Sequence, residues 1–251
     1  MDNFYTDLKG EPSQGILDIS ATKQYPLGTR YAKNDGRVFR YTQAGAVALV
    51  AGDLIQSAIT SGATTTPQID MTPVVALAGA YKVSVTSKAT VQPKDTFADG
   101  WLAITDGDAA GAMGDLYRIK SHPASEATTA GWIFTLYEPL KRAITTSSRI
   151  SVLKPIYKDV IQAPVTTATG VAVGVCPTVV TANYYFWLQT WGMSNVLVKT
   201  ALVAGQNVQR DVLAAGSVGK AVVTLWAENI GMSGWVTATT ASGFVFLTIA
   251  P

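Results

Sequence analysis

Tyr184-Tyr185-Phe186-Trp187 opens a segment that continues as Leu188-Gln189-Thr190-Trp191-Gly192. Aromatic side chains favour the pleated surface of a β-sheet. At strand period, one face carries Tyr185, Trp187, Gln189 and Trp191, and the other carries Tyr184, Phe186, Leu188 and Thr190. Both faces are largely apolar, which predicts the central strand of a β-sandwich or barrel, covered on both sides. A second hypothesis is that the Trp and Gln side chains line a ligand pocket.

The chain is poor in charge. Charged residues are 14% of its 251 residues, and 19 Lys and Arg against 17 Asp and Glu give a formal net charge of +2. The basic residues are scattered, which argues against direct binding of DNA or RNA. No apolar run reaches the roughly 18 residues of a membrane span, and no signal-peptide pattern opens the chain. We expect a protein made in the cytosol that stays soluble or joins an assembly.

Short alternating segments bounded by turn residues recur along the chain. The clearest is a hairpin in which residues 29–33 lead through Asn34-Asp35-Gly36 into residues 37–42, because Asp-Gly between alternating segments favours a tight turn. We expect this hairpin to be partly exposed, with its Arg and Lys residues solvated or against an acidic partner. Further strands are expected near residues 83–86, 101–105, 116–120, 132–137, 171–175, 196–198, 221–226 and 244–249.

These strands predict an all-β fold, a β-sandwich or β-barrel-like structure with very little helix. The best helical candidate is residues 209–215, ended by Gly216. Residues 1–27 are polar and irregular and predict an extended N-terminal arm, which stays disordered unless something ties it down. Composition then divides the chain into a β-rich region at 28–160 and a low-charge β-rich region at 161–251, packed with the first.

The pentapeptide Ala48-Leu49-Val50-Ala51-Gly52 recurs as Ala201-Leu202-Val203-Ala204-Gly205. In both places polar residues and then an apolar one follow the glycine. Each copy is therefore interpreted as a turn that delivers the chain into a strand. Two related β modules would account for the repeat, and so would chance in a chain rich in Ala and Val.

No convincing catalytic motif is present. His122, the only histidine, lies in a turn-like Ser121-His122-Pro123 without a nucleophile elbow. Cys176 is the only cysteine, which excludes an intrachain disulfide and a metal cluster built on Cys and His. Its apolar neighbours predict a buried side chain. We expect no catalytic, cofactor-binding or metal-binding residue and no enzymatic activity.

Two segments come close to known ligand loops. Asp106, Asp108 and Asp115 lie in a glycine-rich segment, but an EF-hand loop begun at Asp106 would place Tyr117 at the position that needs glutamate. A β-turn is expected there, with a different calcium site as the alternative. Residues 170–174, Gly-Val-Ala-Val-Gly, lack the helix and lysine of a phosphate-binding loop. Their glycines are expected to mark bends in a sheet.

Several segments resemble a group of tailed-bacteriophage virion structural proteins. They are residues 36–41, 44–46 and 48–53, then 117–123, 140–149 and, above all, 184–192. The Gly-Val-Ala-Val-Gly-Val and Val-Ala-Gly-Asp segments are also similar to those of smaller β-barrel capsid decoration proteins. The likeness covers much of the chain beyond the arm, but it is one of composition and position and carries over no functional residue.

The resemblance implies a non-enzymatic capsid decoration, or cement, protein on the outer capsid surface of the virion. Such a protein binds and bridges the major capsid protein and is commonly a trimer; it needs no cofactor and contacts neither nucleic acid nor membrane. The alternative is a tail or head-fibre protein whose exposed Trp and Tyr side chains stack on host glycans. A glycan-degrading enzyme would need paired carboxylates in a cleft, and acidic residues are scarce in the second half of the chain.

The decoration hypothesis makes a prediction about the arm. Deleting residues 1–27 is expected to weaken binding to shells while the β core stays folded. Shell binding by the shortened chain, measured beside its folding, checks both parts, and undiminished binding would remove the arm from the hypothesis.

Overall fold

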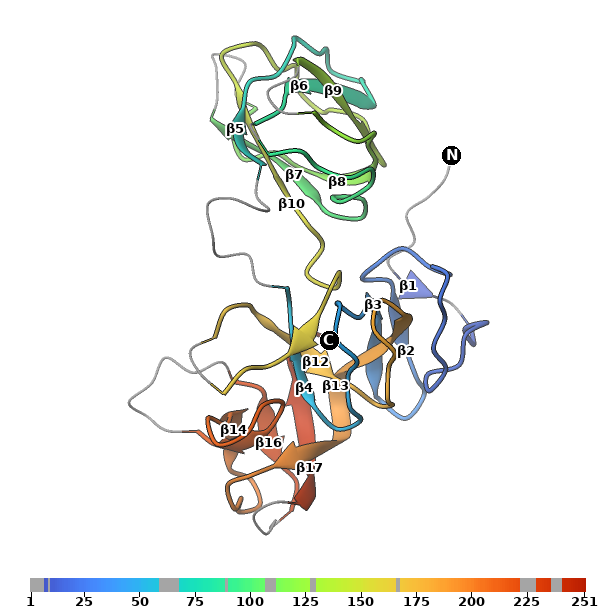
Figure 1. Ribbon diagram of the computed structural model, residues 1–251, viewed down its shortest axis with the longest axis vertical. Coiled ribbons are helices and arrows are strands. Elements are labelled where there is room, and N and C mark those ends of the chain that lie inside the picture. The colour runs from blue at the N-terminus through green and yellow to red at the C-terminus, as the bar shows by residue number, and fades with distance from the viewer. Residues whose placement is uncertain are drawn as a thin grey trace. The chain divides into compact units, whose positions relative to one another are not determined.

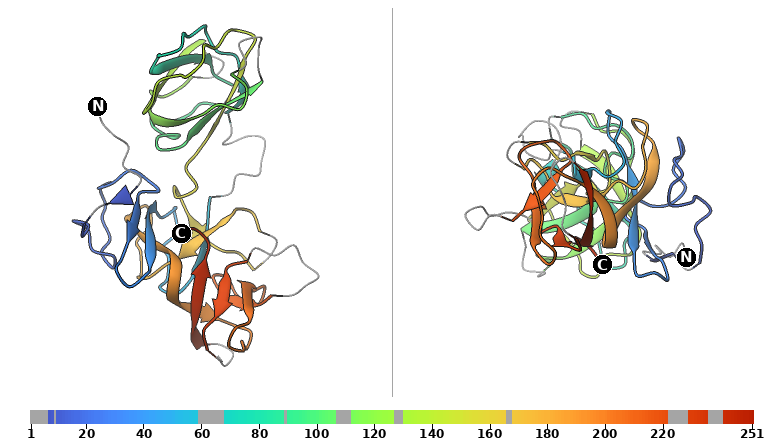
Figure 2. Two further views of the ribbon diagram at one scale, coloured as in Figure 1. Left: turned by 180° about the vertical axis from the view of Figure 1, so that it is seen from behind. Right: turned by 90° about the horizontal axis from the view of Figure 1, so that it is seen from below.

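The computed structural model describes residues 7–8, 10–58, 68–88, 90–106, 112–126, 130–165, 168–221, 229–235 and 241–251. All of the regular secondary structure in these residues is β-strand, which confirms the predicted all-β, barrel-like class (Figure 1 and Figure 2). The chain divides into two compact units. One is Thr60–Pro155, and the other combines Tyr5–Ile59 with Ile156–Pro251, so the first is inserted into the second.

The inserted unit is a curved six-stranded sheet in the order β5-β10-β7-β8-β9-β6. Its strands are β5 (Gln68–Met71), β6 (Lys82–Thr86), β7 (Trp101–Asp106), β8 (Leu116–Ser121), β9 (Ala130–Leu136) and β10 (Arg149–Leu153). Backbone bonds from Val74 N–H to the Ser84 carbonyl (2.8 Å) and from Thr86 N–H to the Thr72 carbonyl (2.9 Å) join the two edges. Alternating side chains of these strands fill its core, as their period-2 patterns predict.

The flanking unit contains the remaining eleven strands. They are β1 (Asp7–Leu8), β2 (Arg30–Ala32), β3 (Val38–Gln43), β4 (Leu54–Gln56), β11 (Ile161–Gln162), β12 (Ala172–Val175), β13 (Tyr185–Val198), β14 (Asn207–Arg210), β15 (Val218–Lys220), β16 (Gly231–Ser233) and β17 (Ala241–Thr248). Pairings β13–β15, β15–β14, β14–β16, β16–β17 and β17–β13 close a five-stranded barrel, called here the C-terminal barrel.

The predicted division at residue 160 is wrong in one respect. The unit boundary does fall nearby, after Pro155, but residues 28–59 belong with the C-terminal part of the chain and not with residues 60–155. The reason is strand pairing, because β3 pairs with β13 and β4 pairs with β12. Composition along the chain carries no information about such long-range pairing.

Strand β13 is the central strand of the flanking unit, as predicted. Its first half pairs with β3 and its second half with β17. The change of partner occurs at a bulge between Gln189 and Trp191, followed by Gly192 with φ of +82°. A Cβ on Gly192 would lie 3.0 Å from the Gly36 carbonyl oxygen, so glycine allows both the left-handed backbone and the close approach of the β2–β3 turn.

Both faces of the first half of β13 are covered. Trp187 is completely buried with Tyr31, Phe39 and Tyr41, while Phe186 and Leu188 pack on the other side with Leu49, Ile55, Val160 and Val173. The predicted hairpin forms as β2 and β3, and its expected partial exposure is confirmed for β2 and the turn, where Ala32 and residues 34–36 are exposed, but not for β3. Phe39 and Thr42, on opposite faces of β3, are both fully buried, because β3 lies between β2 and β13.

Residues 10–27 do not form a free arm. The Trp187 indole N–H donates to the Gln14 carbonyl (2.8 Å), the Tyr41 hydroxyl donates to Gln14 Oε1 (2.8 Å), and Gln14 Nε2 donates to the Tyr185 carbonyl (3.0 Å). Leu27 is buried in the same cluster. Residues 10–27 are therefore held in place by the core of their own chain. Deletion of residues 1–27 would expose Trp187 and would not leave the core intact.

Two local predictions had opposite outcomes. The helix expected at 209–215 is wrong, because Val208 to Arg210 pair with β15 and the Asp211 carboxylate accepts from the Leu213 N–H (2.9 Å) in a turn. Both copies of the repeated pentapeptide are turns that enter strands, β4 and β14, and Gly52 and Gly205 have φ of +86° and +78°.

Of the strand expected at 221–226, residues 222–226 lie outside the described residues.

The contacts of Gln14 predict a large effect of a small truncation. Gln14→Ala removes the acceptor of the buried Tyr41 hydroxyl and one of the donors to the Tyr185 carbonyl. Because the Gln24 and Ser20 N–H groups still donate to these two oxygens, we expect the free energy of unfolding to fall by about 1–2 kcal/mol. Leu17→Ala, in the same segment but 60% exposed, should change it by less than about 0.5 kcal/mol. Urea unfolding followed by Trp fluorescence measures both, and equal effects would mean that residues 10–27 are not part of the core.

Candidate functional site

The outer surface of the C-terminal barrel carries the most unusual side chains of the flanking unit. Along β17, Val245 and Leu247 point into the barrel, whereas Phe244 and Phe246 point outward and are 58% and 40% exposed. The strand register places Met193 of β13 and Met232 of β16 on either side of Phe246 in one row. These methionines are 45% and 46% exposed. We name Met193, Met232, Phe244 and Phe246 the Met–Phe face.

Two tryptophans extend this surface. Trp191 makes an edge-to-face contact with Phe246, with ring centroids 5.9 Å apart. Trp235 follows β16 and is 67% exposed, and Ser233 Oγ donates to its carbonyl (2.6 Å). Outward positions of a surface strand are ordinarily polar. Here β13, β16 and β17 contain no Asp, Glu, Lys or Arg at all.

This composition is typical of a surface that is covered by a partner. Contiguous exposed apolar patches mark interaction sites, and Met and aromatic residues are enriched at protein interfaces while charged residues are depleted at their centres. Cross-strand registration holds the four side chains of the Met–Phe face on a rigid sheet. The face can therefore bury apolar area without first ordering a loop.

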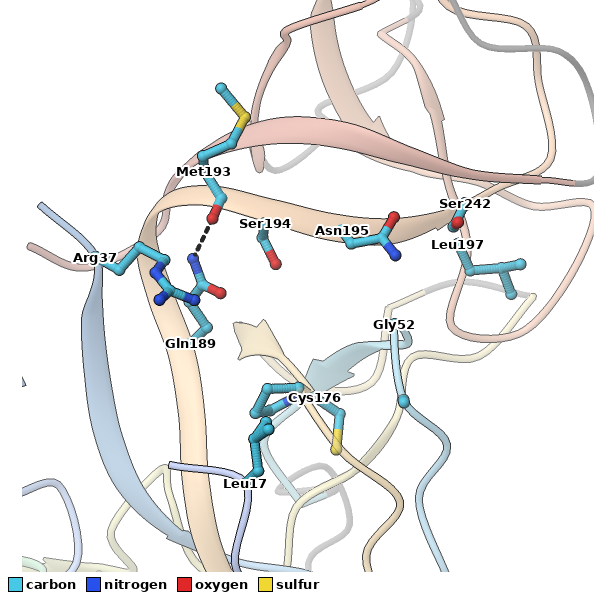
Figure 3. A pocket seen from close by; sticks show the side chains of 12 residues that line it. Leu17, Arg37, Gly52, Cys176, Gln189, Met193, Ser194, Asn195, Leu197 and Ser242 are labelled. Atoms are coloured by element: carbon cyan, nitrogen blue, oxygen red, sulfur yellow. Dashed lines mark hydrogen bonds between the residues drawn. The ribbon is translucent and has the colours of Figure 1, made fainter. Parts of the chain in front are cut away.

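A cavity of about 410 Å³ lies beside β13 (Figure 3). Gln189 lines it, and its Nε2 donates to the carbonyls of Trp191 (3.2 Å) and Met193 (2.9 Å). The hypothesis that the Trp and Gln side chains of residues 184–192 line a pocket is supported for Gln189 only, because neither Trp187 nor Trp191 is among the described lining residues. Trp187 is buried in the core, so its indole is not available to a ligand.

His122 is a structural residue of the inserted unit. It is buried at the end of β8, against Trp132 and Phe134. Its Nε2 accepts from the Phe97 N–H (2.9 Å), so Nδ1 carries the proton and donates to the Pro123 carbonyl (2.7 Å). Both ring nitrogens are thus used within the fold, and the expected loop histidine is in fact a core histidine.

The other candidate residues also have structural roles. The Asp115 carboxylate pairs with Arg142 and accepts from the Tyr117 hydroxyl (2.9 Å), whereas Asp106 is exposed and Asp108 lies outside the described residues. No group of potential metal ligands occurs among the described residues. Gly174 marks a bulge of β12, as expected, and a Cβ there would lie 2.4 Å from the Gln189 carbonyl oxygen.

Comparison with known proteins finds no relative. No protein-family model matches the chain. Searches of curated proteins and of solved structures also find no match. The part of the chain that the structure describes contains no apolar helix of membrane-spanning length.

Cys176 is predicted to be unreactive in the folded protein. Its side chain is fully buried, and burial raises the pKa of the thiol to about 12. Because the thiolate is the reactive species, the native protein at about pH 8 should not react with a disulfide reagent such as DTNB, whereas the unfolded protein should release one equivalent of thiolate. Rapid reaction of the native protein would show that this region opens readily.

Asp53 is predicted to lower stability at neutral pH. Burial raises the pKa of its carboxyl, although Gln162 Nε2 donates to Oδ2 (2.7 Å). The penalty is absent below the unfolded-state pKa, about 3.9, grows as the pH rises from there to the higher folded-state pKa, and is fully present above it. Asp53→Asn should therefore raise the free energy of unfolding at neutral pH, and the gain should disappear on acidification.

Asp115 provides a control of opposite sign for the same measurement. Its hydrogen bonds with Arg142 lower the pKa of the Asp115 carboxyl, so the ionised form stabilises the fold above about pH 3.9 and this stabilisation is lost as the pH falls. Asp115→Asn should lower the free energy of unfolding at neutral pH, with a difference that shrinks in acid. Urea titrations at several pH values would reveal the two signs, and equal signs would contradict the assignment.

Proposed function

We propose that this protein is a non-enzymatic decoration protein of a tailed-bacteriophage capsid. It binds the outer shell through the Met–Phe face and stabilises the shell by bridging subunits of the major capsid protein. The observation that carries the proposal is the charge-free, exposed apolar surface formed by Met193, Met232, Phe244 and Phe246. The resemblance of residues 36–41, 44–46, 48–53 and 184–192 to virion structural proteins supports the choice of partner.

The physical logic of a cement protein fits this surface. A protein that binds the assembled shell and not its free subunits stabilises the shell by mass action. Each contact can be weak, because several copies or several faces of one assembly engage together. A rigid, neutral β surface loses little conformational entropy on docking. Assembly as a homo-oligomer, with a trimer favoured, would multiply the number of Met–Phe faces presented to the lattice.

A second candidate function is glycan binding by a tail or head-fibre protein. Trp235 favours it, because a Trp side chain that is 67% exposed on a barrel offers an apolar ring for stacking. The two functions differ in their dependence on residues. Trp235→Ala should abolish glycan binding, whereas shell binding should depend chiefly on the row of Met193, Phe246 and Met232.

Phe246→Asp tests the proposed shell contact. Phe246 lies at the centre of the row, and a carboxylate buried there would meet an apolar partner surface, so we expect at least about 30-fold weaker binding to shells, equivalent to about 2 kcal/mol. Leu77→Asp is the matched control, since Leu77 is 72% exposed in the inserted unit. Co-sedimentation with shells assembled from the major capsid protein measures the affinity, and thermal unfolding confirms that both variants fold.

Cryo-electron microscopy of virions locates the protein independently. Density on the outer lattice that bridges capsid subunits, with the Met–Phe face toward the shell, is the expected result. Density confined to the tail or fibre tips, or shell binding that Phe246→Asp leaves unchanged, would overturn the decoration proposal and favour glycan binding.

A further inference from the structure

One edge of β13 is partly open. In the pairing with β17, residues 192, 194, 196 and 198 of β13 direct their backbone groups toward β17, because antiparallel hydrogen bonding alternates along a strand. The odd residues direct theirs to the opposite edge, as the bond from the Leu197 N–H to the Gly52 carbonyl (2.9 Å) shows. At the other end of this edge, Gln189 pairs with Val175 of β12. Between these two attachments no described strand pairs with the edge.

The cavity of about 410 Å³ occupies this interval, and we name it the edge groove. Figure 3 shows β13 along one side of the groove and the segments that carry Gly52 and Cys176 on the other. Ala51 and Pro177 complete that second wall, and Leu17 also lines the groove. The Met193 side chain points away from the groove toward the Met–Phe face, so only the backbone of Met193 serves the groove (Figure 3).

Gln189 makes the edge groove selective. Its side-chain amide donates to the carbonyls of Trp191 and Met193, the two acceptors that an added strand would otherwise use. By the same alternation, the N–H groups of Met193 and Asn195 face away from β17, and neither donates to a backbone carbonyl of the described loops and turns. The groove thus presents backbone donors two residues apart, about 7 Å by strand geometry, while its carbonyls are largely occupied.

The charge of the groove also limits its ligand. Arg37 is the only charged residue among the described residues that line it. The Arg37 guanidinium is already held by Asp35, through Nε (2.9 Å) and Nη2 (2.7 Å) to Oδ2. The remaining lining groups are neutral, including Ser194 and Asn195. A ligand with net charge would therefore find no free counter-charge in the groove.

We infer that the edge groove binds a short, extended, uncharged segment of a partner polypeptide. Two carbonyls of that segment, on alternate residues, accept hydrogen bonds from the Met193 and Asn195 N–H groups, which adds the segment to the edge of β13. Main-chain addition to an open sheet edge is a recurrent mode of peptide recognition, and the volume lies within the roughly 300–1,000 Å³ of ligand sites. The inference stands whichever partner the Met–Phe face binds.

The test uses the full chain and the capped peptide acetyl-Thr-Val-Thr-Val-Thr-amide, which is uncharged and favours an extended backbone. Amide hydrogen exchange is followed by NMR as the peptide is added. At saturation, exchange at Met193 and Asn195 should slow at least about tenfold, because their N–H groups gain acceptors. Gly192 and Ser194 already donate toward β17, so their exchange should change by less than about twofold.

The repeated pentapeptide supplies a matched pair of variants. Ala51 and Ala204 occupy the same position of the same turn and are both exposed, but only Ala51 lines the edge groove. Ala51→Trp should fill the groove and abolish the protection of Met193 and Asn195. Ala204→Trp should leave it unchanged. Thermal unfolding of both variants establishes that any loss of binding is local.

Two results would overturn the inference. One is unchanged exchange at Met193 and Asn195 with millimolar peptide on the unsubstituted chain. The other is protection that spreads evenly over residues 192–195 or survives Ala51→Trp, since either would place the peptide elsewhere. Neither result depends on capsid shells, so failure here is distinct from failure of the proposed function.

Discussion

Complete burial of Trp187 in the middle of β13 is the constraint on which the flanking unit depends. Its indole ring packs against Tyr31 and Tyr41, and its N–H must find an acceptor once it leaves water. The Gln14 carbonyl supplies that acceptor. A segment near the N-terminus, which is polar and has no regular structure of its own, is thereby held against a strand more than 170 positions away.

The bend at Gly192 determines which strands β13 pairs with and which of its surfaces stay open. Before the bend the strand is covered on both faces and pairs with β3, and after it the same strand closes the C-terminal barrel with β17. The edge groove opens where β13 stops pairing with β12 and begins to pair with β17. The Gln189 side-chain amide donates to the Trp191 and Met193 carbonyls, which lose a strand partner there. The outward side chains beyond the bend form the Met–Phe face. Both candidate binding surfaces therefore follow from one change of strand partner.

The proposed functions use complementary properties of these surfaces. The Met–Phe face offers apolar area without charge, which suits a large, neutral partner surface. Such contact does little to fix the orientation of the bound partner. The edge groove offers directional donors but little area, which suits recognition of a short segment. A partner that bound both surfaces would gain affinity from the Met–Phe face, because hydrophobic contact is non-directional. The edge groove would fix the position of the partner along β13, because hydrogen bonds are directional.

Local patterns were enough to predict the all-β class, the strand at 184–192, the Asp-Gly hairpin and the turns at Gly52 and Gly205, because strand period and turn chemistry depend on neighbouring residues. Strand pairing decided the rest: the insertion of Thr60–Pro155, the burial of β3, the docking of residues 10–27 and the strand at 207–210 in place of a helix. The Met–Phe face belongs to this second group. Residues 244–247 are apolar on both faces, so the sequence predicted a strand there but not that Phe244 and Phe246 face outward. Only closure of the barrel, which takes Val245 and Leu247 inside, leaves those two rings exposed.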